Sequence, residues 1–161
     1  MFAPDILNII NNYRTCEFAT ISKSSRATAH PVTPWYRDGM DHILVTTSIG
    51  FPQKIYNIRR NPKVSLLFSN PTASGITSGA MVAVQGDAKL ADSLTTLDEL
   101  EDFWRQMYRW QPASKAYSRT ALSRYLFDWY YIRMRIYVTP RRVLYWQTGD
   151  FSQNPEVMDL S

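Results

Sequence analysis

Alternating apolar and polar positions, the pattern of a strand with one buried face, run through most of the chain. The alternation is clearest in residues 16–22 and 130–139, and in the second stretch Arg133 and Arg135 fall on the face opposite the apolar side chains. Further strands are predicted over residues 42–47, 63–69, 80–90 and 143–147. The pattern therefore predicts a meander of short antiparallel strands.

Glycine and proline mark the places where these strands are interrupted. Two prolines between residues 27 and 36 cannot donate backbone hydrogen bonds, so we expect this extended stretch at a sheet edge. Gly86 predicts a bulge in the strand that contains it. Residues 140–142 are expected to form a turn, and the tail after Gly149 is expected to be loosely ordered.

Apolar side chains at helical spacing predict a few helices among the strands. Asn61 and Pro62 stop the second helix, and a capping box at residues 96–99 begins the third. The expected helices cover residues 4–12, the stretch from Pro52 to about residue 60, residues 97–110 and residues 118–128. Together with the strands they indicate an α+β domain, mainly β, built on an antiparallel barrel.

Composition narrows the class of protein. The chain has 161 residues, 45% of them hydrophobic and 20% charged, which suits one ordered domain. No apolar run is long enough to span a membrane, and the N-terminal segment does not resemble a secretory signal, so we expect a cytoplasmic protein. The single cysteine, Cys16, excludes an internal disulfide and a cysteine-based zinc site. No paired-histidine spacing indicates a catalytic metal.

Charge and aromatic content say less about partners. The net charge of +4 permits nucleic-acid binding, but no basic stripe interleaved with aromatic residues supports it, and we expect no nucleic-acid partner. Aromatic residues make up 14% of the chain. A domain of this size has little room to bury them all, which favours a subunit interface or a flat ligand.

The segment of residues 46–54 carries the strongest sign of a binding site. Thr46, Thr47 and Ser48 end a strand, and Gln53 and Lys54 follow in the first turn of a helix. Backbone N–H groups and partial positive charge at a helix start favour an anion, and a lysine there suits a phosphate. An ordinary surface lysine beside capping hydroxyls remains the alternative. The sequence offers no nucleophile or acid–base pair, which is typical of proteins whose cofactor does the chemistry.

Four stretches in this order resemble the flavin-binding split-barrel family, whose best-known activity is pyridoxamine 5′-phosphate oxidation. They are FATISKSSRATAHPVTPWYRDG, ILVTTSIGFPQKIYNIRRNPKVSLLF, MVAVQGDAKL and RIYVTPRRVLYW. The resemblance implies one domain over residues 1–161, with a six-stranded antiparallel Greek-key split β-barrel at about 16–148 and a helical insert at about 95–128. It also implies a homodimer that binds FMN between its subunits.

The resemblance further implies which residues contact the cofactor. Val32 and Thr33 would lie along the isoalloxazine ring, with His30 close by on the same stretch. The hydroxyls of residues 46–48 would approach the ribityl chain and the phosphate, which Gln53 and Lys54 would hold. Gln85 and Trp146 would come from the other subunit.

Departures from the oxidase pattern separate this chain from the true oxidase. No Arg or His follows Arg142, whereas the oxidase uses both near its C-terminus to engage its substrate. The resemblance therefore implies an uncharacterised branch, with an FMN-dependent oxidoreductase of a small organic substrate as the first hypothesis. Two alternatives remain: a deazaflavin-dependent reductase on the same fold, and a non-catalytic flavin- or haem-binding protein in which His30 would be the candidate axial ligand.

Overall fold

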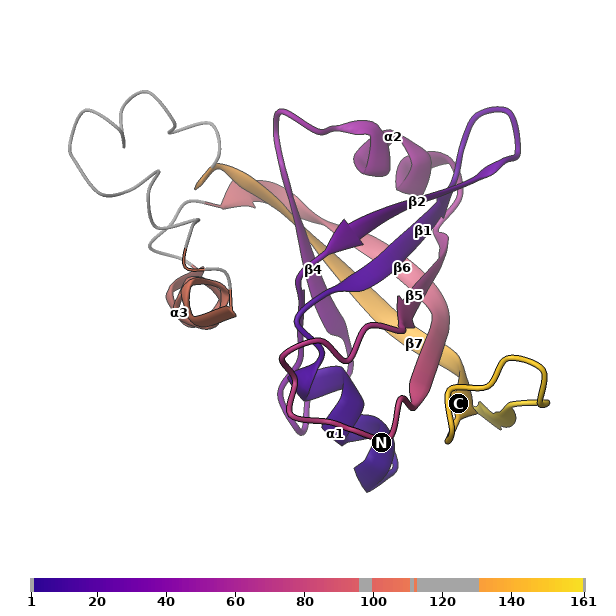
Figure 1. Ribbon diagram of the computed structural model, residues 1–161. Helices are drawn as coiled ribbons and strands as arrows, with labels where there is room; N and C mark the ends of the chain where they lie inside the picture. Colours follow the sequence, from indigo (N-terminus) through magenta and orange to yellow (C-terminus); the bar gives the residue numbers. More distant parts are fainter. Residues whose placement is uncertain (1, 96–99, 111, 113–130, 161) are drawn as a thin grey trace.

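An antiparallel sheet that curls into an open barrel forms the centre of the computed structural model (Figure 1), which describes residues 2–95, 100–110, 112 and 131–160. Within these residues six strands have six or more residues, and two short strands extend the sheet. The long strands are β1 (Cys16–Ile21), β2 (Ala27–Val32), β4 (Ile43–Ser48), β5 (Lys63–Phe68), β6 (Met81–Thr95) and β7 (Arg133–Trp146). The short strands are β3 (Pro34–Trp35) and β8 (Glu156–Asp159).

The strand order confirms the predicted fold class, a split barrel of Greek-key type. The order is β2-β1-β5-β6-β7-β4-β3, with β8 paired to β7, and every pair is antiparallel. Thus β4 pairs with its neighbour β3 and with the distant β7, while β5 returns to pair with β1. The strands at the two ends of this order, β2 and β3, contain Pro31 and Pro34, as expected because proline lacks a backbone donor.

Two helices close opposite ends of the barrel (Figure 1). Helix α1 (Pro4–Asn12) buries Ile6, Ile9 and Ile10 at one end. Helix α2 (Gln53–Arg60) covers the other end and is tied to the β1–β2 hairpin by Asn57, which is fully buried. Asn57 Nδ2 donates to Thr20 Oγ1 at 2.9 Å, so the middle of the helix is held against the sheet.

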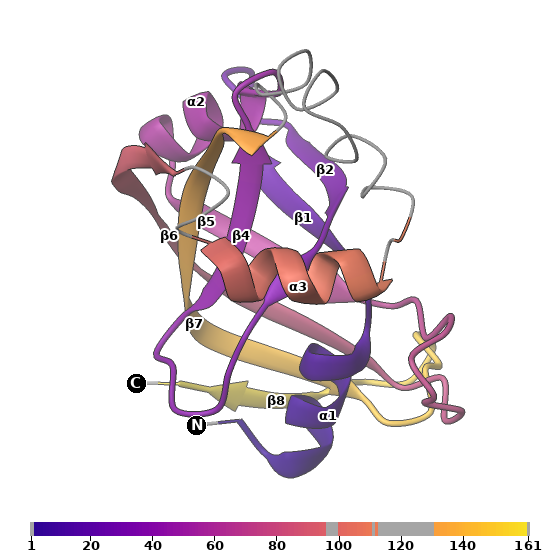
Figure 2. The same ribbon diagram turned by 90° about the vertical axis from the view of Figure 1, so that its left-hand side faces the viewer.

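Strand β4 is buried on both faces, because a helix covers its outer side. Ile43 and Val45 belong to the core inside the barrel, whereas Leu44 packs outside it against α3 (Glu101–Trp110). Figure 2 shows α3 lying across this outer face. The predicted apolar stripe of this helix is confirmed for Leu100, Trp104 and Met107, all of which are buried. The capping box and the helix expected over residues 118–128 lie outside the described residues.

The turn expected at residues 140–142 is wrong, because β7 runs through this segment as one 14-residue strand. Pro140 lies opposite Gly86 and Arg142 opposite Gln85, which leaves Arg141 as the extra residue of a bulge. A Cβ on Gly86 would lie 2.2 Å from the Thr139 carbonyl oxygen. The bulge predicted from Gly86 is therefore confirmed, and the bare glycine lets the two backbones approach.

The tail is also more ordered than expected. Strand β8 pairs with β7 from Arg142 opposite Asp159 to Tyr145 opposite Glu156. Arg142 Nε donates to Asp159 Oδ1 at 2.6 Å on the same pair of strands. The pairing is hard to predict from the sequence, because three of the four residues of this short edge strand are exposed and only Met158 is partly buried.

Candidate functional site

A cavity of about 320 Å³, which we call the Lys54 cavity, lies where the end of β4 meets the start of α2. Strand ends, the β4–α2 connection and α3 all contribute to its wall. The described lining consists of Thr15, Pro31, Val32, Thr33, Thr46, Thr47, Ser48, Phe51, Lys54, Phe103, Met107 and Arg133. The structure thus brings together six of the residues singled out from the sequence: Val32, Thr33, Thr46, Thr47, Ser48 and Lys54.

The hydroxyls at the end of β4 are fixed by the turn that follows. Thr47 Oγ1 donates to the Phe51 carbonyl oxygen at 3.1 Å, and the Gly50 N–H donates to Ser48 Oγ at 3.3 Å. All three residues from Thr46 to Ser48 are buried. These bonds hold the polar end of β4 against the first turn of α2, so the hydroxyls stay at the cavity wall.

Lys54 enters the cavity from the second residue of α2. Helical side chains lean toward the helix N-terminus, and this direction carries the lysine back over the end of β4. Burial, and secondarily repulsion from Arg133, lowers the pKa of the Lys54 ammonium from its ordinary value. No acidic residue occupies the first turn of α2, so the helix supplies no local counter-charge.

Arg133 is a functional candidate that the sequence did not reveal. The alternation of residues 130–139 correctly predicts that Arg133 lies on the outer face of β7. Helix α3 covers that face, however, and Arg133 is only 9% exposed. The guanidinium carbon lies 5.0 Å from the centre of the Trp104 ring. The apolar stripe of α3 could have indicated that part of the sheet's outer face is covered, because such a stripe must pack against some part of the sheet.

The other predicted contacts lie outside this lining. His30 is exposed on β2, and Gln53 Nε2 donates to Asn57 Oδ1 at 3.0 Å instead of facing the cavity. The Trp146 indole N–H donates to the Gln153 carbonyl oxygen at 3.1 Å, near the C-terminal loop. Their roles toward a cofactor stay predictions.

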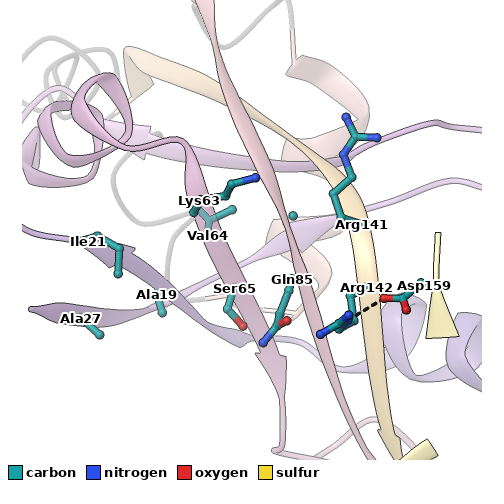
Figure 3. A pocket seen from close by; sticks show the side chains of 11 residues that line it. Ala19, Ile21, Ala27, Lys63, Val64, Ser65, Gln85, Arg141, Arg142 and Asp159 are labelled. Carbon is teal, nitrogen blue, oxygen red and sulfur yellow. Dashed lines mark hydrogen bonds and ion pairs between the residues drawn. The ribbon is translucent and has the colours of Figure 1, made fainter. Parts of the chain in front are cut away.

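Gln85 lies in a second depression, a groove of about 520 Å³ on the outer face of the sheet (Figure 3). Its floor includes a row of cross-strand neighbours, Ala19, Ser65 and Gln85, which point outward from β1, β5 and β6. At one rim Asp87 pairs with Lys63 and Arg141 at 2.7 and 3.1 Å, and these hydrogen bonds lower the pKa of its carboxyl.

The donor set of the Lys54 cavity determines what it can bind. Its described lining carries two cations and several hydroxyls but no Asp or Glu, so it suits an anion. Phe51, Phe103 and Met107 add apolar wall. Among the described residues no cluster of His, Cys, Asp or Glu could hold a metal ion, and no described helix is long and apolar enough to cross a membrane. The Cys16 thiol is fully buried, and burial raises its pKa, which makes it a poor nucleophile.

Fold and cavity together define a split-barrel protein with a cavity lined by cations and hydroxyls. A family model described as "Pyridoxamine 5'-phosphate oxidase" matches residues 2–136, and the chain therefore belongs to this family. No curated protein sequence matches the chain.

Solved structures share the fold at low sequence identity. General Stress Protein 26 from Bacillus anthracis str. Sterne is 18% identical, with a TM-score of 0.62 over 96% of this chain and 95% of that one. A pyridoxamine 5'-phosphate oxidase-related, FMN binding protein from Nostoc punctiforme is 12% identical, with a TM-score of 0.60 over 100% and 99%. A heme binding protein from Mycobacterium smegmatis is 16% identical, with a TM-score of 0.58 over 99% of this chain and 60% of that one. At these identities the likeness is one of fold.

Proposed function

We propose that this protein is a cytoplasmic FMN-dependent oxidoreductase, active as a homodimer, that holds the phosphate of FMN in the Lys54 cavity. One observation carries the proposal. The Lys54 ammonium and the hydroxyls of Thr46, Thr47 and Ser48 converge on a cavity whose described lining contains no carboxylate. A half-buried ammonium without a carboxylate in the same wall is stabilised when an anion binds beside it.

The residues of the cavity fit a phosphorylated flavin. Lys54 and the end of β4 would hold the phosphate, and Val32 and Thr33 at the β2–β3 connection would lie along the ring. When bound, FMN supplies hydride transfer to or from a small organic substrate. The chain would bind and orient the cofactor, while apolar side chains such as Phe103 and Met107 keep water from the cavity.

The groove around Gln85 supports the dimer. Its floor of small outward side chains would let a second subunit approach the sheet closely, and Gln85 is exposed there, away from the Lys54 cavity of its own subunit. A residue that contacts the cofactor from the partner must have this placement. Lys63 and Arg141, which pair with Asp87 at the rim of this groove, are not part of the proposed contact with the cofactor.

Titration of the purified protein with FMN, a deazaflavin coenzyme and haem in parallel tests the proposal. We expect the fluorescence of FMN to be quenched when FMN binds to the protein, with one FMN bound per subunit. Tighter binding of the deazaflavin would make the protein a deazaflavin-dependent reductase. A Soret band that is lost in His30→Ala would identify a haem protein. FMN binding without reduction by any electron donor would leave a non-catalytic flavin carrier.

A further inference from the structure

A second cavity, which we call the Arg135 cavity, lies between the start of α3 and the outer face of β4 and β7. Its volume is about 370 Å³, within the range of about 300–1,000 Å³ in which proteins bind small molecules. Of its described lining only Phe103 also lines the Lys54 cavity. The two cavities are therefore neighbours with different walls.

Aromatic rings form much of the wall of the Arg135 cavity. Trp35 on β3, Leu44 on β4 and Tyr137 on β7 are neighbours across paired strands, so their side chains project from the same face of the sheet. Phe103 of α3 adds a third ring to the lining. His42 lies edge-on to Tyr137, with the two ring centres 4.8 Å apart. Such a wall favours an aromatic ligand, because ring–ring contacts add to the burial of apolar surface.

The two carboxylates in the described lining are already matched by arginines. Asp102 Oδ2 lies 2.9 Å from Arg37 Nη2, and Glu101 Oε1 lies 2.7 Å from Arg105 Nη2. These pairs compensate the two negative charges at the cavity. The charge of Arg135 is left over, because no ion pair of the described residues includes it.

Arg135 is placed where an anion in the cavity would meet it. It lies opposite Thr46, two residues along β7 from Tyr137, and so projects from the same face of the sheet. Its guanidinium carbon lies 6.0 Å from the centre of the Tyr137 ring, and its Nε is buried without a hydrogen-bond partner among the described residues. A partly buried cation in this situation is stabilised when an anion binds beside it.

We propose that the Arg135 cavity binds an aromatic carboxylate, with the aromatic part against Trp35 and Tyr137 and the carboxylate on the Arg135 guanidinium. One uncompensated cation suits a singly charged group, and the guanidinium fork matches the two oxygens of a carboxylate. This site is independent of the proposed flavin function, because Lys54 and the hydroxyls at the end of β4 take no part in it.

Isothermal titration calorimetry of the purified protein tests the proposal with two probes of similar shape, 2-naphthoate and the neutral 2-naphthamide. We expect the wild-type protein to bind 2-naphthoate at least about tenfold more tightly than 2-naphthamide. Arg135→Met should weaken 2-naphthoate about 10- to 100-fold and leave 2-naphthamide unchanged. Arg59→Met, at an exposed position of α2 outside the described lining of both cavities, is the matched control and should change neither affinity.

Three results would each overturn the proposal: no binding of 2-naphthoate, equal affinity for the two probes, or a preference for 2-naphthoate that persists in Arg135→Met. Arg135→Lys keeps the charge but loses the planar fork. It should retain part of the preference, and it serves as the test if methionine prevents folding. Trp35→Leu should weaken both probes and keep the preference, since it removes a ring and leaves the charge; unchanged affinities would overturn the aromatic part of the proposal.

Lys54→Met separates this site from the Lys54 cavity, which also suits an anion. The variant should leave 2-naphthoate affinity unchanged, and Arg135→Met should leave FMN affinity unchanged. Loss of 2-naphthoate binding in Lys54→Met would place the probe in the Lys54 cavity and overturn the proposal. If the protein binds no FMN but Arg135→Met weakens 2-naphthoate, the proposed function fails and the Arg135 site stands.

Discussion

Replacing Lys54 with methionine should remove most of the affinity for the FMN phosphate while leaving the fold intact. The methionine keeps the length and apolar stem of the lysine, so the half-buried side chain still fills its place beside the end of β4. What it loses is the ammonium. Within the described part of the chain the Lys54 ammonium pairs with no carboxylate, so its loss should not leave a buried carboxylate without a partner.

The magnitude follows from the kind of bond that is lost. A hydrogen bond to a charged group contributes about 1.5–3 kcal/mol, and about 1.4 kcal/mol is a tenfold change in Kd. Lys54→Met should accordingly weaken FMN about 10- to 100-fold. Riboflavin, which lacks the phosphate, should bind the variant and the wild-type protein equally. Lys89→Met, at an exposed position of β6 outside the cavity, is the control and should change neither affinity.

The dependence of FMN affinity on pH gives a second readout of the same lysine. Burial and Arg133 lower the pKa of the free Lys54 ammonium, and a bound phosphate favours the protonated form and raises it again. Affinity should therefore be full below the pKa of the free protein and fall as the pH rises through it. That fall should begin at lower pH than an exposed lysine would give, and Lys54→Met should lack it.

The assay is quenching of flavin fluorescence over a range of pH, with circular dichroism to show that each variant is folded. Equal FMN affinity in Lys54→Met and the wild-type protein would refute the phosphate assignment. An equal loss of affinity for FMN and riboflavin would also refute it, because the lysine would then act on the ring or on the fold.

Three further predictions concern the barrel and the proposed dimer. Gly86→Ala should lower the free energy of unfolding by about 2–3 kcal/mol, because its Cβ would meet the Thr139 carbonyl oxygen at 2.2 Å. Gly75→Ala, whose Cβ meets nothing within 4 Å but whose φ is +82°, should cost about 1 kcal/mol, and urea denaturation that reverses this order would contradict the account. Asn57→Ala should cost about 2–4 kcal/mol by the same measurement, since it removes the hydrogen bonds to Thr20 and Thr28 that join α2 to the sheet and two more within the helix; a loss below 1 kcal/mol would count against that role. Ser65→Arg, on the groove floor, should convert a dimer into monomers in sedimentation velocity, and an unchanged dimer would place the interface elsewhere.

Local patterns predicted the parts of the structure that depend on local causes. The strand at Cys16, the edge prolines and the helix that stops at Asn61 all follow from alternation, a missing donor or a helix stop within a few residues. The cluster from Thr46 to Lys54 was predictable for the same reason, because a strand end and a helix start are adjacent in sequence.

Contacts between distant segments explain what the sequence did not predict. Arg133 is covered by Trp104 of α3, and nothing beside Arg133 in the sequence indicates that cover. The turn expected around Pro140 is absent because Gly86, far away in the chain, gives the bulged strand room to continue. The Gln53 side chain does not line the cavity, because its amide donates a hydrogen bond to Asn57, one helical turn later.

The most direct test of the central claim is the visible absorption spectrum of the purified protein, followed by mass spectrometry of the compound that heat releases. The account predicts a two-band flavin spectrum, FMN as the released compound, and loss of both in Lys54→Met. A single deazaflavin band, a Soret band, or a colourless protein that takes up no FMN when it is offered would contradict it.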